Sequence, residues 1–213
     1  MPKYTYFALA AATAGLVALG AASPALAAAP RTPVTLTLGS ATGPNVAVGD
    51  VLSAALSGTS TLGTSAGNIT CKAGSFSSKV LTNTTTAATA TVTSLSFTAS
   101  TCTSGIPGTT GVTSIGLKSG TAPVASISPT TLQLTVTPTV AVVLSSILGP
   151  VSCYYAGSAV GNLVNASHSL AFPSVSVTKQ TGSSALCPAS GTFVATYAPV
   201  VDTTQASQDV WVN

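Results

Sequence analysis

The chain has 213 residues, and only 4% of them are charged, which excludes most functions that depend on ionisable side chains. Three aspartates, no glutamate and one histidine leave acid–base catalysis and metal binding with very few residues to use. Six lysines and arginines are too few and too scattered for the basic surface that nucleic acid binding needs. Ser and Thr supply about 30% of the positions, and the mean hydropathy of +0.57 disfavours disorder.

The N-terminal residues are typical of a secretory signal. Lys3 precedes an uncharged apolar stretch, and Ser23-Pro-Ala-Leu-Ala27 supplies the small residues of a cleavage site. We therefore predict a signal peptide over residues 1–27 and a secreted, extracellular mature chain that begins at Ala28. The alternative is a retained membrane anchor, which Pro24 and the moderate hydropathy of the stretch disfavour. We expect no stable membrane insertion after cleavage.

Four cysteines, an even number in an exported chain, predict two disulfides. Their spacing favours the pairs Cys71–Cys102 and Cys153–Cys187, each closing a loop of a little over thirty residues, and the two other pairings stay open. No cysteine has a partner two to four residues away, as a zinc site would need. We expect no metal and no cofactor.

Alternating apolar and polar residues predict strands along much of the mature chain. The strands are expected at residues 34–38, 88–97, 132–137, 174–178 and 192–197, and a break at Thr93-Ser94 indicates a β-bulge. Glycine and proline predict turns at residues 42–44, 105–108, 149–150 and 181–182. Residues 46–56 fit either a helix or a strand. Residues 140–148 form the longest apolar run, which favours a buried strand over a short helix.

These patterns predict an all-β fold, an antiparallel β-sandwich that is immunoglobulin-like or related and carries two disulfides. Residues 28–40 are expected to form an N-terminal strand or tail, and residues 41–213 a single sandwich domain. Threonine on the solvent faces of the strands takes the place of the usual charged side chains.

The few ionisable residues offer little for catalysis. A Ser–His–Asp triad would need His168 with Asp50, Asp202 or Asp209, but His168 lies in a polar turn and no Gly-x-Ser-x-Gly motif occurs. A glycosidase would need two carboxyl groups, and Asp202 and Asp209 could approach each other, although a solvated segment explains both equally well. We predict no catalytic residues and no enzymatic activity.

Three aromatic residues are predicted as possible ligand contacts, namely Tyr154, Tyr155 and Trp211. Adjacent residues on a strand face opposite ways, so one of the two tyrosines is expected to lie in the core.

The cysteines and the strand sequences beside them follow a recognisable order. It runs Asn68-Ile-Thr-Cys71, Val92-Thr-Ser-Leu-Ser-Phe97 before Cys102, Gly149-Pro-Val-Ser-Cys153, and Cys187 before Phe193-Val-Ala-Thr-Tyr197. Over most of residues 60–200 the chain resembles the small secreted Ser/Thr/Ala/Gly-rich proteins with four cysteines of Streptomyces and other actinobacteria. The resemblance implies an exported protein with this fold and assigns no activity.

Two functions follow as hypotheses. The first is a secreted, non-enzymatic β-sandwich of the cell surface or medium with a structural or interaction role. The alternative is a carrier of an apolar small molecule in a groove between the sheets, with residues 140–148, Tyr154 and Tyr155 as its walls. The partners that fit are a cell-surface polymer, an apolar ligand or a second copy of the chain bound through edge strands.

Overall fold

A computed structural model describes residues 32 and 34–213, and the predicted signal peptide lies outside this range. Over the described residues the chain is almost entirely antiparallel β-structure, and its only helical elements are two short 3₁₀ turns, Ala99–Thr101 and Asn165–Ser167. The prediction of an antiparallel β-sandwich with two disulfides is confirmed.

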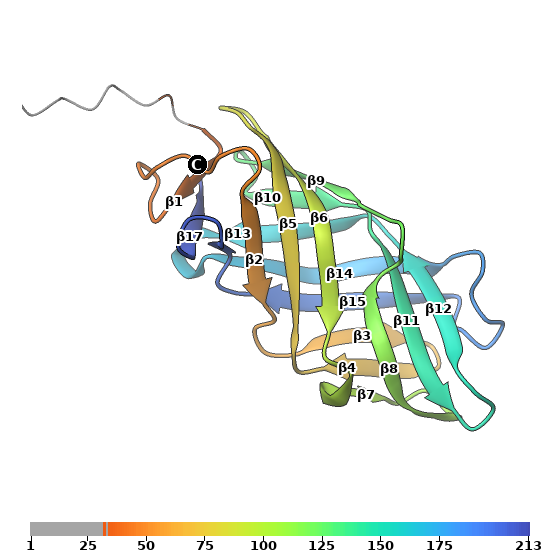
Figure 1. The fold of residues 1–213 in the computed structure, drawn as a ribbon. Coiled ribbons are helices and arrows are strands. Elements are labelled where there is room, and N and C mark those ends of the chain that lie inside the picture. The colour runs from red at the N-terminus through yellow and green to blue at the C-terminus, as the bar shows by residue number, and fades with distance from the viewer. Residues whose placement is uncertain (1–31, 33) are drawn as a thin grey trace, which may run out of the picture. The chain divides into compact units, whose positions relative to one another are not determined.

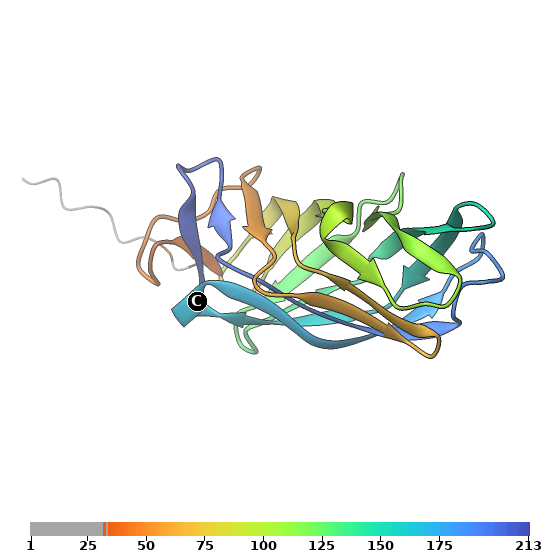
Figure 2. The same ribbon diagram turned by 90° about the horizontal axis from the view of Figure 1, so that it is seen from below.

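The strands form two layers that face each other across the core (Figures 1 and 2). In hydrogen-bonded order, the first layer contains β2 (Val51–Ala55), β5 (Gly74–Asn83), β6 (Ala88–Phe97), β8 (Thr109–Leu117), β11 (Thr139–Ser146) and β12 (Val151–Ala156). The second layer contains β10 (Gln133–Val136), β13 (Ala159–Val164), β14 (Ser169–Lys179), β15 (Ser190–Tyr197), β3 (Ser60–Thr64), β4 (Gly67–Cys71) and β7 (Cys102–Ser104). The strands of one layer run across those of the other (Figure 1).

Two joins connect the layers through backbone hydrogen bonds. The strand β9 (Val124–Ser128) pairs with the first half of β6 on one side and with β10 on the other. The last residues of β12 pair with the end of β14. Gly157 follows β12 at this second join, where the carbonyl oxygen of Ser176 occupies the space that a Cβ atom would need. The close approach therefore requires glycine at this position.

Three further strands extend the first layer beyond β2, namely β16 (Val201–Asp202), β17 (Gln208–Val212) and β1 (Leu36–Leu38). Side-chain amides fix them to the sandwich. The Asn83 amide nitrogen donates to the carbonyl oxygens of Leu36 (2.9 Å) and Val46 (2.8 Å), and that of Asn165 donates to Val212 (2.7 Å). The Leu36 carbonyl also accepts from the Val46 N–H group (3.1 Å), so the side-chain amides add to the backbone pairing at this end of the sheet.

A β-bulge in β6 and another in β14 change which residues face inward. In β6, Ser78 pairs with Val92 and Ser77 with Ser94, so Thr93 is the extra residue, at the predicted position. Before the bulge the inward residues are Ala88, Ala90 and Val92, and after it they are Leu95 and Phe97. The inward positions would otherwise fall on Ser94 and Ser96, so the bulge keeps apolar side chains in the core.

The bulge in β14 has the same effect on the facing layer. Leu170 and Phe172 face inward before it and Val175 and Val177 after it, since residues 173 and 174 together lie opposite one residue of β15. This bulge contains Pro173, which cannot donate a hydrogen bond to a neighbouring strand.

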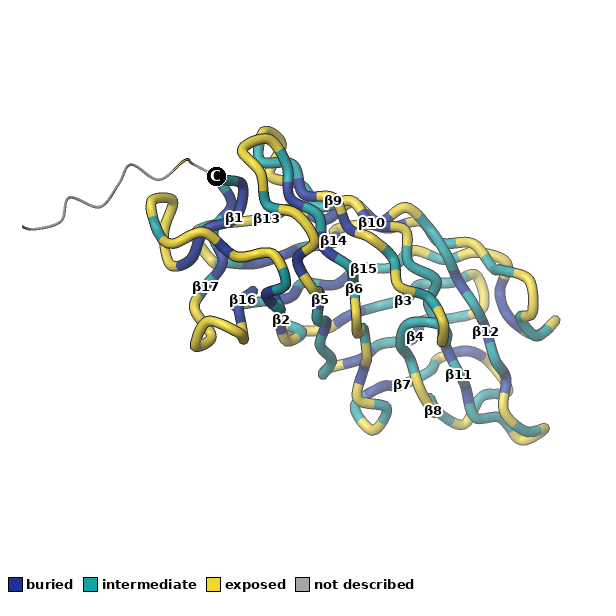
Figure 3. Tube along the Cα trace, turned by 45° about the horizontal axis from the view of Figure 1, so that its top comes forward, coloured by how far each residue is buried: buried dark blue, intermediate teal, exposed yellow. Residues whose placement is uncertain are grey.

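Two of the uncertain sequence segments are resolved. Residues 139–146 form β11, so the favoured strand interpretation of residues 140–148 is confirmed, with Ile147 and Leu148 in the exposed turn that follows. Within residues 46–56 the strand begins at Val51. Buried and exposed residues alternate along the strands of both layers (Figure 3).

Both disulfides have the favoured pairing. Cys71 and Cys102 lie directly opposite each other on β4 and β7. Cys153 of β12 is bonded to Cys187, which lies between β14 and β15. The four cysteines are buried, and the bonds close loops of 31 and 34 residues.

Two buried aspartates meet beside β2. Asp50 and Asp202 have exposed fractions of 5% and 0%, and their carboxyl groups are within hydrogen-bonding reach of each other. Oδ1 of Asp202 accepts hydrogen bonds from the backbone N–H groups of Thr204 (2.9 Å) and Gln205 (3.2 Å), whereas Oδ2 has no N–H or hydroxyl donor. Burial and the neighbouring Asp50 carboxyl raise the pKa of Asp202, and the two N–H donors lower it. The net direction is upward, with burial as the largest cause.

The first prediction concerns the disulfides. Replacing either cysteine pair with alanines should lower the free energy of unfolding by about 3–4 kcal/mol, because each bond restricts a loop of similar length in the unfolded chain. Urea denaturation of the two double variants measures this loss. A loss below about 1 kcal/mol in both variants would contradict it.

The second prediction concerns the aspartate pair. A raised pKa in the folded state makes the contribution of Asp202 to stability greatest at low pH, and this contribution falls as pH rises through that pKa. Asp202→Asn keeps the acceptor for both N–H groups and gives Asp50 a permanent donor. The variant should be more stable than the parent at pH 7, by on the order of 1 kcal/mol, and less dependent on pH between about 4 and 7.

Denaturation at a series of pH values tests this, with Asp209→Asn on the neighbouring strand as the control. That change removes the same charge from a half-exposed position and breaks the contact with His168 (3.7 Å), but it leaves the Asp50–Asp202 pair in place. The fall in stability with rising pH that this pair causes should therefore remain. Lower stability of Asp202→Asn at pH 7 would show that burying the Asp202 carboxylate beside Asp50 does not destabilise the fold.

Candidate ligand-binding cavity

A cavity of about 130 Å³ lies between the two layers, where the two bulged strands contribute to opposite walls. From the first layer β6 contributes Val92, Leu95 and Phe97. From the second layer β14 contributes Leu170, Phe172, Val175 and Val177. The wall also includes residues of both buried apolar clusters, so the cavity lies between the two parts of the core.

The cavity wall is almost wholly apolar. None of its residues carries a charge, and the hydroxyl-bearing residues among them are Ser60, Ser78, Tyr155 and Tyr197. A charged molecule would lose its hydration there without gaining a counter-ion, so the wall favours an uncharged apolar occupant.

Side chains on the inner faces show that this space is unfilled. Leu95 faces inward between the exposed residues Ser94 and Ser96, yet it is only half-buried. Phe193 is likewise half-buried between exposed Thr192 and Val194. In a fully packed sandwich such inward residues are covered by the opposite layer, and here they face the cavity instead.

An empty cavity of this size is costly. At about 24 cal/mol per Å³ for an enclosed cavity, a volume of about 130 Å³ sets an upper limit on the order of 3 kcal/mol, because this cavity is partly open. The net stability of a domain is only about 5–15 kcal/mol. The cavity is therefore a substantial cost unless something occupies it.

The predicted ligand contacts lie in three different places. Tyr155 of β12 is buried in the cavity wall, and its hydroxyl donates to the carbonyl oxygen of Pro188 (3.1 Å). Burial raises the pKa of this hydroxyl. Tyr154 faces the other way, with the ammonium nitrogen of Lys118 4.7 Å from its ring centre. The expectation that one of the two tyrosines lies in the core is thus confirmed.

Trp211, the third predicted contact, lies on β17 away from the cavity wall. Its ring packs edge-on against His168, with 5.9 Å between the ring centres. Residues 140–148, the apolar run predicted as a wall of the groove, line the cavity only in part. Val140 and Val142 of β11 lie in the cavity wall together with Tyr155.

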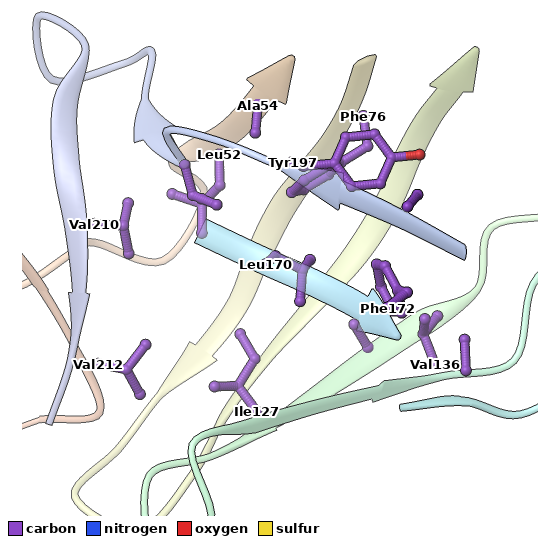
Figure 4. Close-up of a cluster of buried hydrophobic side chains, with 14 of the residues drawn as sticks. Leu52, Ala54, Phe76, Ile127, Val136, Leu170, Phe172, Tyr197, Val210 and Val212 are labelled. Carbon is purple, nitrogen blue, oxygen red and sulfur yellow. The ribbon is translucent and has the colours of Figure 1, made fainter. Parts of the chain in front are cut away.

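Tyr197 of β15 is a wall residue that was not among the ligand contacts predicted from the sequence. Its ring is 1% exposed and packs edge-on against Phe76 of the first layer and Phe172 of the second, with ring centres 5.1 Å and 6.4 Å away (Figure 4). Its hydroxyl has no hydrogen-bond partner among the described residues. Burial raises the pKa of this hydroxyl well above its ordinary value.

The structure also shows where the residues considered for catalysis lie. His168 Nε2 is 3.7 Å from a carboxylate oxygen of Asp209, and Nδ1 is 3.3 Å from the carbonyl oxygen of Val210. Asp202 lies beside Asp50, so the structure does not bring Asp202 and Asp209 together as a carboxyl pair. Within the described range, no group of three or more His, Cys, Asp or Glu residues could hold a metal ion.

The same part of the chain contains no helix that is long and apolar enough to cross a membrane. Comparison with known proteins gives no match to a family model, to a curated protein or to a solved structure.

Proposed function

We propose that this chain is an exported, non-enzymatic β-sandwich that carries a small, uncharged apolar molecule between its two layers. The observation that carries the proposal is the uncharged cavity of about 130 Å³ at the bulges of β6 and β14. An apolar cavity of about 150 Å³ in another protein stays dry and binds benzene or xenon. The proposed ligand therefore has a compact core close to benzene in size.

Export is the second part of the proposal. Two buried disulfides fit a protein that folds in an oxidising compartment, and the N-terminal sequence has the features of a secretory signal. A surface rich in serine and threonine suits a carrier outside the cell, because it binds water without forming a strongly charged surface.

The carrier hypothesis is favoured over a purely structural role because of its energetics. A structural protein gains stability by filling its core, whereas this chain leaves a space between two clusters of large apolar side chains. Binding an apolar molecule there would restore the missing contacts and raise stability in proportion to occupancy.

The third prediction tests occupancy of the cavity. The mature protein should bind benzene saturably in an NMR titration, and its midpoint of thermal unfolding should rise with benzene concentration. The double variant Val92→Phe/Val177→Phe fills the space from both layers. It should bind benzene at least tenfold more weakly and unfold with a free energy no lower than that of the parent.

The control is Val194→Phe, the same substitution at a position on β15 that is 39% exposed. It adds the same side chain without entering the cavity, so its benzene affinity should match that of the parent. Failure of the parent to bind benzene, or equal binding by the filled variant, would rule out this cavity as the ligand site.

A further inference from the structure

A second, smaller cavity of about 40 Å³ lies next to the first, on the side of β17. Figure 4 shows Leu170 between the walls of the two cavities, with Val210 of the second on one side and Phe172 of the first on the other. Four residues line both spaces, namely Phe76, Ser78, Leu134 and Leu170. The two cavities are therefore neighbours in the space between the layers, with these shared residues between them.

The wall of the second cavity offers a ligand almost no polar partner. It adds three polar residues to the shared ones, Asn165, His168 and Ser169, and each already has a partner in the protein. The Asn165 amide exchanges two hydrogen bonds with the backbone of Val212 (2.7 and 2.9 Å). Nδ1 of His168 lies 3.3 Å from the carbonyl oxygen of Val210, and the Ser169 hydroxyl is paired with that of a neighbouring serine (2.9 Å). An occupant of this space would therefore be apolar.

The size of the second cavity limits what it can hold. A buried water needs about 10–15 Å³ and two to four polar partners, so the volume would admit about three waters but the wall does not bind them well. A benzene-sized ring needs a space closer to that of the first cavity. A short alkyl chain fits both the volume and the apolar wall.

The shared side chains allow the two spaces to be occupied together. Leu170 is buried and Leu134 is only half-buried, and each has two side-chain torsions that can change rotamer. The empty volume beside them gives these side chains room to move when a larger molecule enters. A ligand that extends from the first cavity toward β17 therefore meets leucine side chains at the boundary.

We propose that the ligand has a benzene-sized ring in the first cavity and a short, unbranched alkyl tail that reaches the second cavity past Leu134 and Leu170. This inference rests on the proposed carrier function and specifies its ligand class. The tail would fill apolar space that the ring alone leaves empty. Each CH₂ group that it buries there should strengthen binding by about fourfold before the cost of moving the leucines.

Benzene and n-propylbenzene are the two probes that test the inference, with affinities measured by NMR titration. The parent protein should bind n-propylbenzene more tightly than benzene, by about tenfold or more. Intermolecular NOEs should connect the terminal methyl group of n-propylbenzene with Val210 and Val212, which line the second cavity and not the first. The ring protons should give NOEs to Leu95 and Val177 of the first cavity.

A substitution in the second cavity should remove the advantage of the tail. Ala90 faces inward on β6, is 2% exposed and lines the second cavity alone. Ala90→Val should reduce the affinity ratio of the two probes to about threefold or less, with benzene affinity within about twofold of the parent. Val212→Ile is a smaller change in the same wall, and its effect should have the same direction, so overpacking by Ala90→Val does not leave the test undecided.

The matched control is Ala55→Val, the same substitution at an exposed position on β2 outside both cavity walls. Both affinities should match those of the parent. Thermal unfolding of all variants without ligand shows whether each remains folded.

The outcomes separate the inference from the proposed function. If benzene binds the parent and n-propylbenzene binds no more tightly, or its methyl group gives NOEs only to the first cavity, the tail assignment is wrong and the carrier function stands. If neither probe binds the parent, the carrier function and the assignment both fail.

Discussion

The two layers are held together by apolar side chains that must face inward along strands that cross at a large angle. On β6 and β14 this constraint is met only because each strand contains a bulge, at Thr93 and at Pro173-Ser174. Without these bulges, serine and threonine would face the core over half of each strand. The bulges also bend the strands that contribute Leu95 and Val177 to opposite walls of the cavity. Core packing and the cavity thus have the same origin.

The near absence of charge has a physical role in this arrangement. Serine and threonine supply many of the exposed positions on the outer faces, and apolar side chains with a few hydroxyls line the space between the layers. The uncharged interior therefore does not attract ligands of either charge, and a ligand would be selected by its shape and by single hydrogen bonds. The ionisable pair that is fully inside, Asp50 with Asp202, lies beside β2 and outside the cavity wall, where it links the β16–β17 hairpin to the first layer.

Much of the fold could be predicted from local patterns. Alternation along residues 88–97 indicated β6 together with its bulge at Thr93, and cysteine spacing indicated both disulfides. The bulge in β14 was missed because Pro173 was not included in the predicted strand. At this proline the inward-facing residues of β14 change from even-numbered to odd-numbered positions. The strand β8 was missed because glycine and serine weaken its alternation.

The site was less predictable, because it depends on residues far apart in the chain. Strand alternation could place Tyr154 and Tyr155 on opposite faces, but it could not tell which tyrosine lies in the core. Tyr197 looked like an ordinary strand residue until the fold placed it between Phe76 and Phe172 with its hydroxyl unpaired. The approach of Asp202 to Asp50 likewise depends on the pairing of β16 with β2.

The central claim is that an accessible apolar cavity lies between the bulged strands, and a crystal structure of the mature protein under xenon pressure tests it most directly. Xenon binds in apolar cavities of this size without needing a polar partner. The account predicts xenon density between β6 and β14, in contact with Leu95 and Val177. Opposing side chains in direct contact across that space, with no xenon between them, would contradict it.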